Sequence, residues 1–228
     1  MEPAASVSPS VPKTPPTTLE IWADIVCSWC YVGKRHLEAA LEGFGEDDVE
    51  IVWRSFELDP TLPTDAGSAD EELARRRGLT IAEARAMHEE TERMGAEIGI
   101  RFDFARARRG NTFDAHRVLH MAQAEGRQAG MMDRLLAAYF SEGEPIGDRD
   151  ALARLAGAAG LDAGAVAAML AGDDYAAEVR GDEREAAELG ISAVPFFVID
   201  RRYGISGAQP AETITQVLER VWAETEAA

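Results

Sequence analysis

The chain has 228 residues, 46% of them hydrophobic, only two cysteines and a formal net charge of −18 at pH 7. A chain of this length buries a substantial core without covalent staples, and two cysteines exclude a secreted scaffold built on disulfides. The acidic balance argues against nucleic acid as a partner, and no apolar stretch reaches the roughly 18 residues of a membrane span. We therefore expect a soluble cytoplasmic protein whose thiols carry out chemistry.

The N-terminal segment is rich in Pro, Ser and Ala. It lacks the basic stretch followed by an apolar core that marks a signal peptide. We predict that residues 1–18 form a disordered leader.

The two cysteines lie between a strand pattern and a helix pattern. Residues 19–25 form a short apolar run, residues 31–41 carry an apolar stripe at helical spacing, and Cys27-Ser28-Trp29-Cys30 lies between them. At a helix N-terminus, unpaired N–H groups and the helix dipole favour a thiolate, and the thiol pKa in such motifs falls from about 8.5 to roughly 3.5–7.5. Cys30 lies one turn further on, close enough to form a disulfide. We predict that Cys27 is the nucleophile and Cys30 its resolving partner.

Three other interpretations of the pair compete with this one. A structural zinc site needs a second pair of ligands, and the candidates are four histidines: His36, His88, His116 and His120. His116 and His120 are four residues apart, but their separation from the cysteines fits no common zinc module, so we predict no metal site. A structural disulfide closing so short a loop does little for a chain of this length. The strand-turn-helix context argues against inert buried thiols.

Residues 49–56 alternate as a second strand, which completes a β-α-β unit. Prolines then break the pattern, and the chain from about 69 to 189 is helical in character. The expected helices are 69–77, 81–98, 112–125, 131–141, 149–157, 163–170 and 175–189. We expect the methionines of this region to fill the core, and the arginine clusters at 75–77 and 106–109 to be solvated faces paired with carboxylates.

The strand pattern returns at residues 193–200, and a further short strand at 204–206 completes a hairpin. A final helix is expected over residues 211–223. Pro195 opens this strand after a β-branched residue, so it is a candidate for a cis peptide bond; a trans proline starting an edge strand is the alternative.

Four segments together resemble the DsbA-like branch of the thioredoxin superfamily, and in particular its FrnE-like intracellular proteins. They are DIVCSWCYVG at 24–33, NTFDAHR at 111–117, VPFFV at 194–198 and ISGAQ at 205–209. The resemblance implies an α/β protein with a thioredoxin fold and a large all-helical insertion domain. We expect the thioredoxin-like domain at 19–65 and 190–225 and the insertion at 66–189.

The resemblance also implies thiol–disulfide exchange, with Pro195 in cis beside Cys27 and its preceding carbonyl and amide pairing with an extended substrate. The partners would be protein or small-molecule thiols and disulfides, with no cofactor besides the redox-active disulfide and with glutathione as an optional co-substrate. Ser28 stands where such proteins often carry proline, which leaves open the balance between oxidase, isomerase and reductase. The oligomeric state is also open.

Two neighbouring families supply the alternative function. The 2-hydroxychromene-2-carboxylate isomerases and kappa-class glutathione transferases share this architecture, but they typically carry serine where Cys27 stands and an acid near Gln209. A neutral Gln209 weakens a dedicated glutathione site. The alternative is therefore a glutathione-dependent small-molecule isomerase or kappa-type transferase, acting in polyketide or aromatic metabolism. A third interpretation is a chaperone or interaction module whose cleft binds apolar segments.

The expected substrate-binding residues surround the cysteine pair or belong to the motifs of the resemblance: Ser28, Trp29, Asn111, His116, Val194, Pro195 and Gln209. Asn111 would orient a substrate amide, and His116 would act as a proton carrier or polar contact near Cys27. The alternatives are a helix-capping role for Asn111 and a structural interdomain role for His116.

Overall fold

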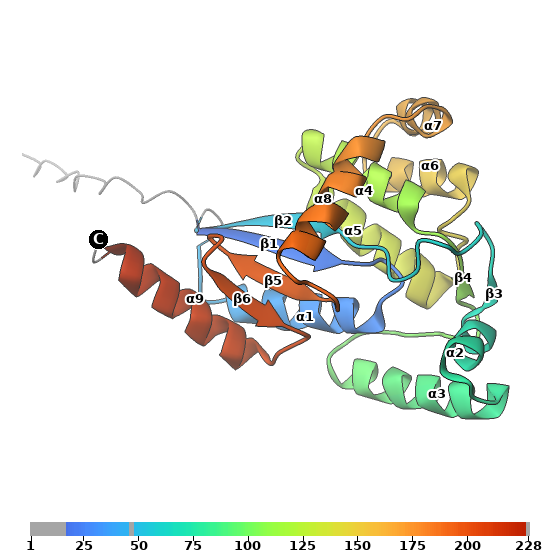
Figure 1. Cartoon of the computed structure of the whole chain (residues 1–228), viewed down its shortest axis with the longest axis horizontal. Helices are drawn as coiled ribbons and strands as arrows, with labels where there is room; N and C mark the ends of the chain where they lie inside the picture. Colours follow the sequence, from blue (N-terminus) through green and yellow to red (C-terminus); the bar gives the residue numbers. More distant parts are fainter. Residues whose placement is uncertain (1–16, 46–47, 227–228) are drawn as a thin grey trace, which may run out of the picture.

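A central mixed sheet organises the computed structural model, which describes residues 17–45 and 48–226 (Figure 1). Its strands are β1 (Thr17–Ala23), β2 (Val49–Ser55), β5 (Phe196–Ile199) and β6 (Tyr203–Ser206), in the order β2-β1-β5-β6. β2 runs parallel to β1, whereas β5 is antiparallel to β1 and to β6. Of the predicted leader, residues 1–16 lie outside the described residues, and Thr17 and Thr18 belong to β1.

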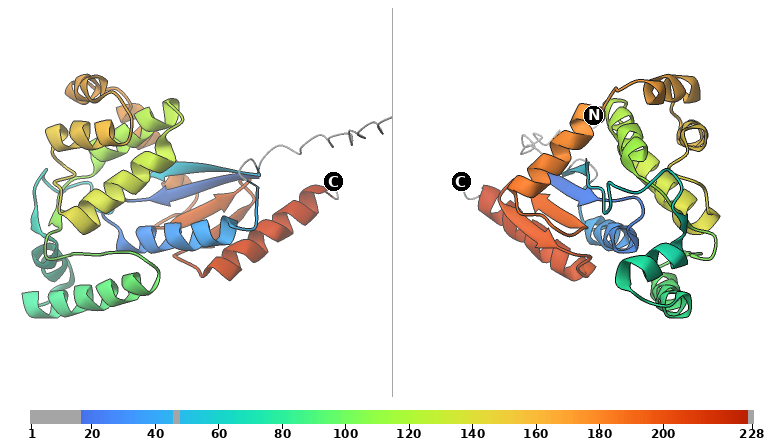
Figure 2. Two further views of the ribbon diagram at one scale, coloured as in Figure 1. Left: turned by 180° about the vertical axis from the view of Figure 1, so that it is seen from behind. Right: turned by 45° about the vertical axis from the view of Figure 1, so that its right-hand side comes forward.

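The two faces of the sheet bury alternate residues of β1, as the pleat of a strand requires. Leu19 and Ile21 belong to the main core, which also holds buried residues of α1 (Ser28–Leu41) and α9 (Ala211–Glu226). Trp22 packs on the opposite face, in a cluster with Ala186 of α8 (Ala176–Glu188). Figure 2 shows α8 on one side of the sheet and α1 and α9 on the other.

A group of helices covers the β2 edge of the sheet. It consists of α4 (Phe113–Ala124), α5 (Gln128–Ala137) with a π-helical extension at Ala138–Glu142, α6 (Arg149–Ala158) and α7 (Ala163–Ala171). The Gln128 side chain accepts a hydrogen bond from the Trp53 amide at 2.9 Å and donates one to the Trp53 carbonyl at 2.8 Å. The Gln128 side chain thus pairs with both backbone groups of Trp53 as a neighbouring strand would, and it covers the edge of β2 at this residue.

A smaller helical hairpin faces the end of β1. It contains α2 (Ala69–Arg77) and α3 (Ile81–Glu97), which begin at capping boxes on Ser68 and Thr80. The predicted helical insertion is therefore present. It is not all-helical, because β3 (Gly67–Ser68) pairs with β4 (Arg108–Arg109) at the base of this hairpin.

The structure differs from the expected domain division at α8, which the sequence analysis included in the insertion. The Asp182 side chain on α8 accepts a hydrogen bond from the Ser55 amide at 2.8 Å, and its carbonyl accepts one from Trp22 Nε1 at 3.0 Å. This helix is therefore a covering layer of the central sheet. Across the described residues, no helix combines the length and apolar character needed to cross a membrane.

Candidate active site

Cys27 is the N-cap residue of α1, at the strand-to-helix turn predicted from the sequence. Its backbone is extended, and its Sγ accepts a hydrogen bond from the Cys30 amide at 3.3 Å. Cys27 is 7% exposed and Cys30 is 1% exposed, and both are free thiols. A cap position satisfies one unpaired amide of the first turn and places the sulfur at the positive end of the helix dipole.

The environment separates the two thiols in acidity. A hydrogen bond from the Cys30 thiol is the main influence lowering the pKa of Cys27, with help from the Cys30 and Trp29 amides and against burial and the charge of Asp24. Burial raises the pKa of Cys30 well above its usual value, and the neighbouring Cys27 raises it further. Cys27 is therefore the sulfur that ionises first, with a protonated Cys30 behind it.

Asp24 is a buried carboxylate directly behind the cysteine pair. Its Oδ2 accepts a hydrogen bond from the Leu58 amide at 2.8 Å, and its Oδ1 lies 3.6 Å from His116 Nε2. Burial pushes the pKa of Asp24 upward, but the interactions with His116, Leu58 and Arg109 outweigh it and hold the pKa below the usual value. A buried charged carboxylate therefore acts on both cysteines, and its charge raises the pKa of each.

The peptide bond between Val194 and Pro195 is cis, as the resemblance implies. The Cys27 thiol lies 3.6 Å from the Val194 carbonyl, which accepts its hydrogen bond. Pro195 is packed against α1 at Gly33, where an added Cβ would lie 2.9 Å from Pro195 Cγ. Glycine at position 33 therefore lets the helix approach the proline loop closely. Strand β5 begins only at Phe196, three residues later than expected.

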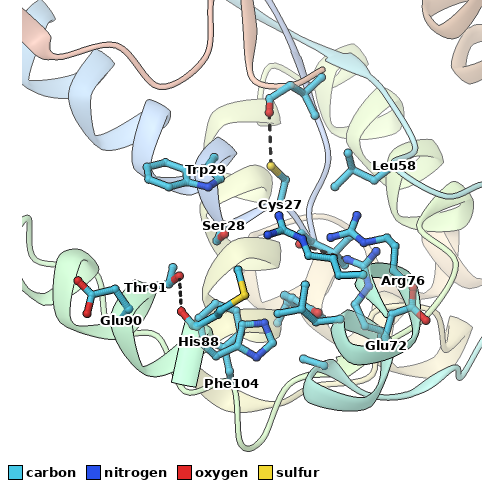
Figure 3. A pocket seen from close by; sticks show the side chains of 18 of the residues that line it. Cys27, Ser28, Trp29, Leu58, Glu72, Arg76, His88, Glu90, Thr91 and Phe104 are labelled. Atoms are coloured by element: carbon cyan, nitrogen blue, oxygen red, sulfur yellow. Dashed lines mark hydrogen bonds between the residues drawn. The ribbon is translucent and has the colours of Figure 1, made fainter. Parts of the chain in front are cut away.

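A pocket of about 550 Å³ opens in front of Cys27 (Figure 3). Ser28 and Trp29 form one side of it and Val194 another, and the helical hairpin faces them. The hairpin residues in its lining are Ala69, Glu72, Leu73, Arg76 and Arg77 of α2, and Met87, His88, Glu90, Thr91 and Met94 of α3. Trp29 is 51% exposed, so its ring is available to a bound molecule.

Of the seven expected substrate-binding residues, the structure brings Ser28, Trp29 and Val194 into the pocket lining. Pro195 is buried beside them. Gln209 is exposed and lies outside the lining, with its carbonyl 2.9 Å from His36 Nδ1 and its Nε2 donating to the Ser206 carbonyl at 2.9 Å. It is therefore part of the turn that follows β6.

Asn111 and His116 do not line this pocket, so the structure does not bring them to the side of Cys27 on which the pocket opens. The Asn111 amide donates to Glu57 at 3.0 Å, and its oxygen accepts from the Phe113 amide at 2.9 Å. His116 is fully buried behind Asp24. The motif at 111–117 holds the helices together, because the Arg117 guanidinium donates to three carbonyl oxygens, those of Met169, Gly172 and Asp174.

Sequence reasoning missed four residues of the site. Asp24 belongs to the motif around the cysteines, and a carboxylate three residues before the first cysteine of a CxxC is the signal that points to it. Arg109 was expected to be solvated, but it is 7% exposed and donates to the Val26 carbonyl at 3.2 Å. Met87 and Met94 were expected in the core, yet both are exposed and line the pocket. In the described part of the chain, no group of three or more metal-ligating side chains occurs.

The model of the DSBA-like thioredoxin domain matches residues 18–219. The chain belongs to this family. DsbA-like proteins are thiol–disulfide oxidoreductases, and the position of Cys27 and Cys30 agrees with that chemistry. The assignment to the FrnE-like subgroup stays a prediction.

Individual relatives extend the comparison. A probable DsbA oxidoreductase of Streptomyces coelicolor, SCO1869, is 44% identical, with a TM-score of 0.86 and coverage of 91% of each chain. The uncharacterized protein YwbO of Bacillus subtilis is 29% identical over 182 residues, which span 79% of this chain and 86% of YwbO. A 2-hydroxychromene-2-carboxylate isomerase is 13% identical with a TM-score of 0.66, covering 92% of this chain and 98% of its own, and thus shares the DsbA-like fold.

Proposed function

We propose that this protein is a cytoplasmic, FrnE-like thiol–disulfide oxidoreductase or isomerase that uses Cys27 and Cys30 and no other cofactor. The observation that carries the proposal is the unequal pair of thiols. Cys27 caps a helix and has a lowered pKa, whereas Cys30 is buried and has a raised pKa. Two-step disulfide exchange requires a nucleophile that ionises easily and a second thiol that stays protonated until the mixed disulfide has formed.

The exchange starts when the Cys27 thiolate attacks one sulfur of a substrate disulfide. The substrate S–S bond breaks, the first thiolate leaves and takes a proton from solvent, and a mixed disulfide forms on Cys27. Cys30 then loses its proton, for which the Asp24 carboxylate is the nearby acceptor, and attacks Cys27 Sγ. The second thiol leaves, so that the substrate is reduced by two electrons and the protein is oxidised to the Cys27–Cys30 disulfide.

Val194 and Trp29 would hold the substrate during these steps. The Val194 carbonyl faces Cys27 at the start of the β5 loop, where it can accept a hydrogen bond from an extended substrate backbone. The exposed Trp29 ring follows Cys27 directly and offers apolar contact area. Pro195 supports both by packing against Gly33 of α1.

Turnover of a protein disulfide tests the proposal. We expect the protein to accelerate the reduction of insulin by dithiothreitol and to re-form native disulfides in scrambled ribonuclease. The opposing result has two parts. The protein shows no exchange activity but isomerises 2-hydroxychromene-2-carboxylate in the presence of glutathione, and the Cys30→Ser variant keeps the full isomerase activity. That result would favour the glutathione-dependent isomerase, whose chemistry needs no second cysteine.

A further inference from the structure

Three arginines line the pocket that contains Cys27: Arg76 and Arg77 on α2, and Arg109 on β4. Figure 3 shows Arg76 at the side of the pocket formed by α2. Arg109 is nine-tenths buried, and its Nε has no hydrogen-bond partner. Arg76 and Arg77 are exposed and form no ion pair with any described residue. On a chain with a net charge of −18, two exposed arginines without an ion pair and a third with an unpartnered Nε form a local exception around one pocket.

The acids near these arginines are already neutralised. Glu72 accepts two hydrogen bonds from Arg75, at 2.9 and 3.0 Å, and Glu90 pairs with Arg93. Asp70, on the same helix as Glu72, binds His88 and Arg85. The charges of Arg76 and Arg77 therefore remain as the excess that a bound molecule meets beside Cys27, whereas the charge of Arg109 also acts on the buried Asp24.

The pocket also has an apolar side and a limited size. Met87 and Met94 of α3 face the opening together with Leu73 and Trp29. Its volume of about 550 Å³ lies in the range of roughly 300–1,000 Å³ that is typical of sites for small molecules. A ligand for this site therefore combines a short apolar body with anionic groups that reach the arginines.

We propose that the pocket binds a low-molecular-weight disulfide that carries carboxylates. The inference rests on the proposed function and names its substrate class. Arginine binds a carboxylate through two parallel N–H···O bonds, which would fix the disulfide beside Cys27. The thiolate attacks the nearer sulfur and one carboxylate-bearing thiol leaves; attack by Cys30 then releases the second, leaving Cys27 and Cys30 oxidised.

Three probes of similar length and different charge test the inference: dithiodipropionate with two carboxylates, neutral bis(2-hydroxyethyl) disulfide, and cationic cystamine. The measurement is the second-order rate of oxidation of the fully reduced protein by each probe. Variants are compared as ratios to the parent for the same probe, which removes the intrinsic reactivity of the leaving thiols. The double variant Arg76→Gln/Arg77→Gln changes exposed positions only. Arg184 of α8 is likewise exposed and lies outside the pocket lining, so Arg184→Gln is the control.

In the double variant, we expect the rate with dithiodipropionate to fall about tenfold more than the rate with bis(2-hydroxyethyl) disulfide, and cystamine to gain relative to both. Arg184→Gln should leave the ranking of the probes unchanged, and added salt should reduce the preference of the parent for the dianion. Equal changes for all three probes, or none, would overturn the inference while leaving the exchange function intact. A reduced parent protein that none of the probes oxidises would overturn the proposed function itself.

Discussion

Cys27→Ser is expected to lower the rate of disulfide exchange by about a thousandfold or more, because a serine hydroxyl does not ionise near neutral pH and cannot replace the thiolate. The variant should keep its fold. Cys27 is the N-cap residue of α1, and serine is among the preferred N-cap residues. Insulin reduction measures the loss, and the far-ultraviolet circular dichroism of the variant should match that of the parent.

Cys30→Ser is the matched variant, because it removes the second sulfur and leaves the first. We expect it to attack substrate disulfides but to stop at the mixed disulfide, which mass spectrometry of the intact protein detects as an adduct on Cys27. Overall turnover is lost in both variants, whereas the adduct forms only in Cys30→Ser. Adduct formation by Cys27→Ser but not by Cys30→Ser would reverse the roles of the two cysteines.

Asp182→Ala is expected to destabilise the protein by about 3–5 kcal/mol, the usual result of removing one partner from a buried charged network. The Asp182 carboxylate accepts hydrogen bonds from the Ser55 amide at 2.8 Å and Arg54 at 3.1 Å, and it lies 3.1 Å from His120 Nε2. Its removal leaves the Ser55 amide and His120 without this buried carboxylate between α8 and the sheet, whereas Arg54 keeps its bond to Glu20. Unfolding in urea, followed by circular dichroism, measures the change in the free energy of unfolding.

Glu183→Ala is the control for this effect, since the ion pair of Glu183 is with the half-exposed Arg180, and its loss should cost less than about 1 kcal/mol. The pH dependence of the free energy of unfolding is a second test. Burial opposes ionisation of Asp182, but His120 and the Ser55 amide outweigh it and lower its pKa. The contribution of ionised Asp182 to the free energy of unfolding is therefore complete above the pKa of Asp in the unfolded chain, about 4. It is lost as the pH falls through the lower pKa that Asp182 has in the folded protein. Asp182→Ala should lose less stability in acid than the parent; equal losses would contradict the assignment.

Most of the fold elements that the sequence predicts correctly follow from local sequence patterns. The apolar run before Cys27 and the helical stripe after it placed the cysteine pair at a strand-to-helix turn, and the structure has that turn. Turn and strand signals likewise placed the β5–β6 hairpin around Asp200, which adopts a positive φ of 47°. These features depend on residues near in sequence, so a pattern of a few residues records them.

The features of the site that the sequence does not predict depend on contacts between distant segments. Whether Arg109 is solvated depends on the Val26 carbonyl, 83 residues away, and whether Met87 is in the core depends on what covers α3. His116 belongs to a motif of the resemblance, but a motif does not show which side of Asp24 its side chain occupies. In each case the residue type was compatible with both interpretations, and tertiary packing decided between them.

The thiolate titration of Cys27 tests the central claim most directly. Thiolate absorbance in the ultraviolet is followed against pH for the reduced parent, with Cys27→Ser as the blank. We predict a midpoint below the value of about 8.5 for a free cysteine, which Cys27→Ser removes, while Cys30 stays protonated to higher pH. A Cys27 that titrates at or above about 8.5 would contradict the account.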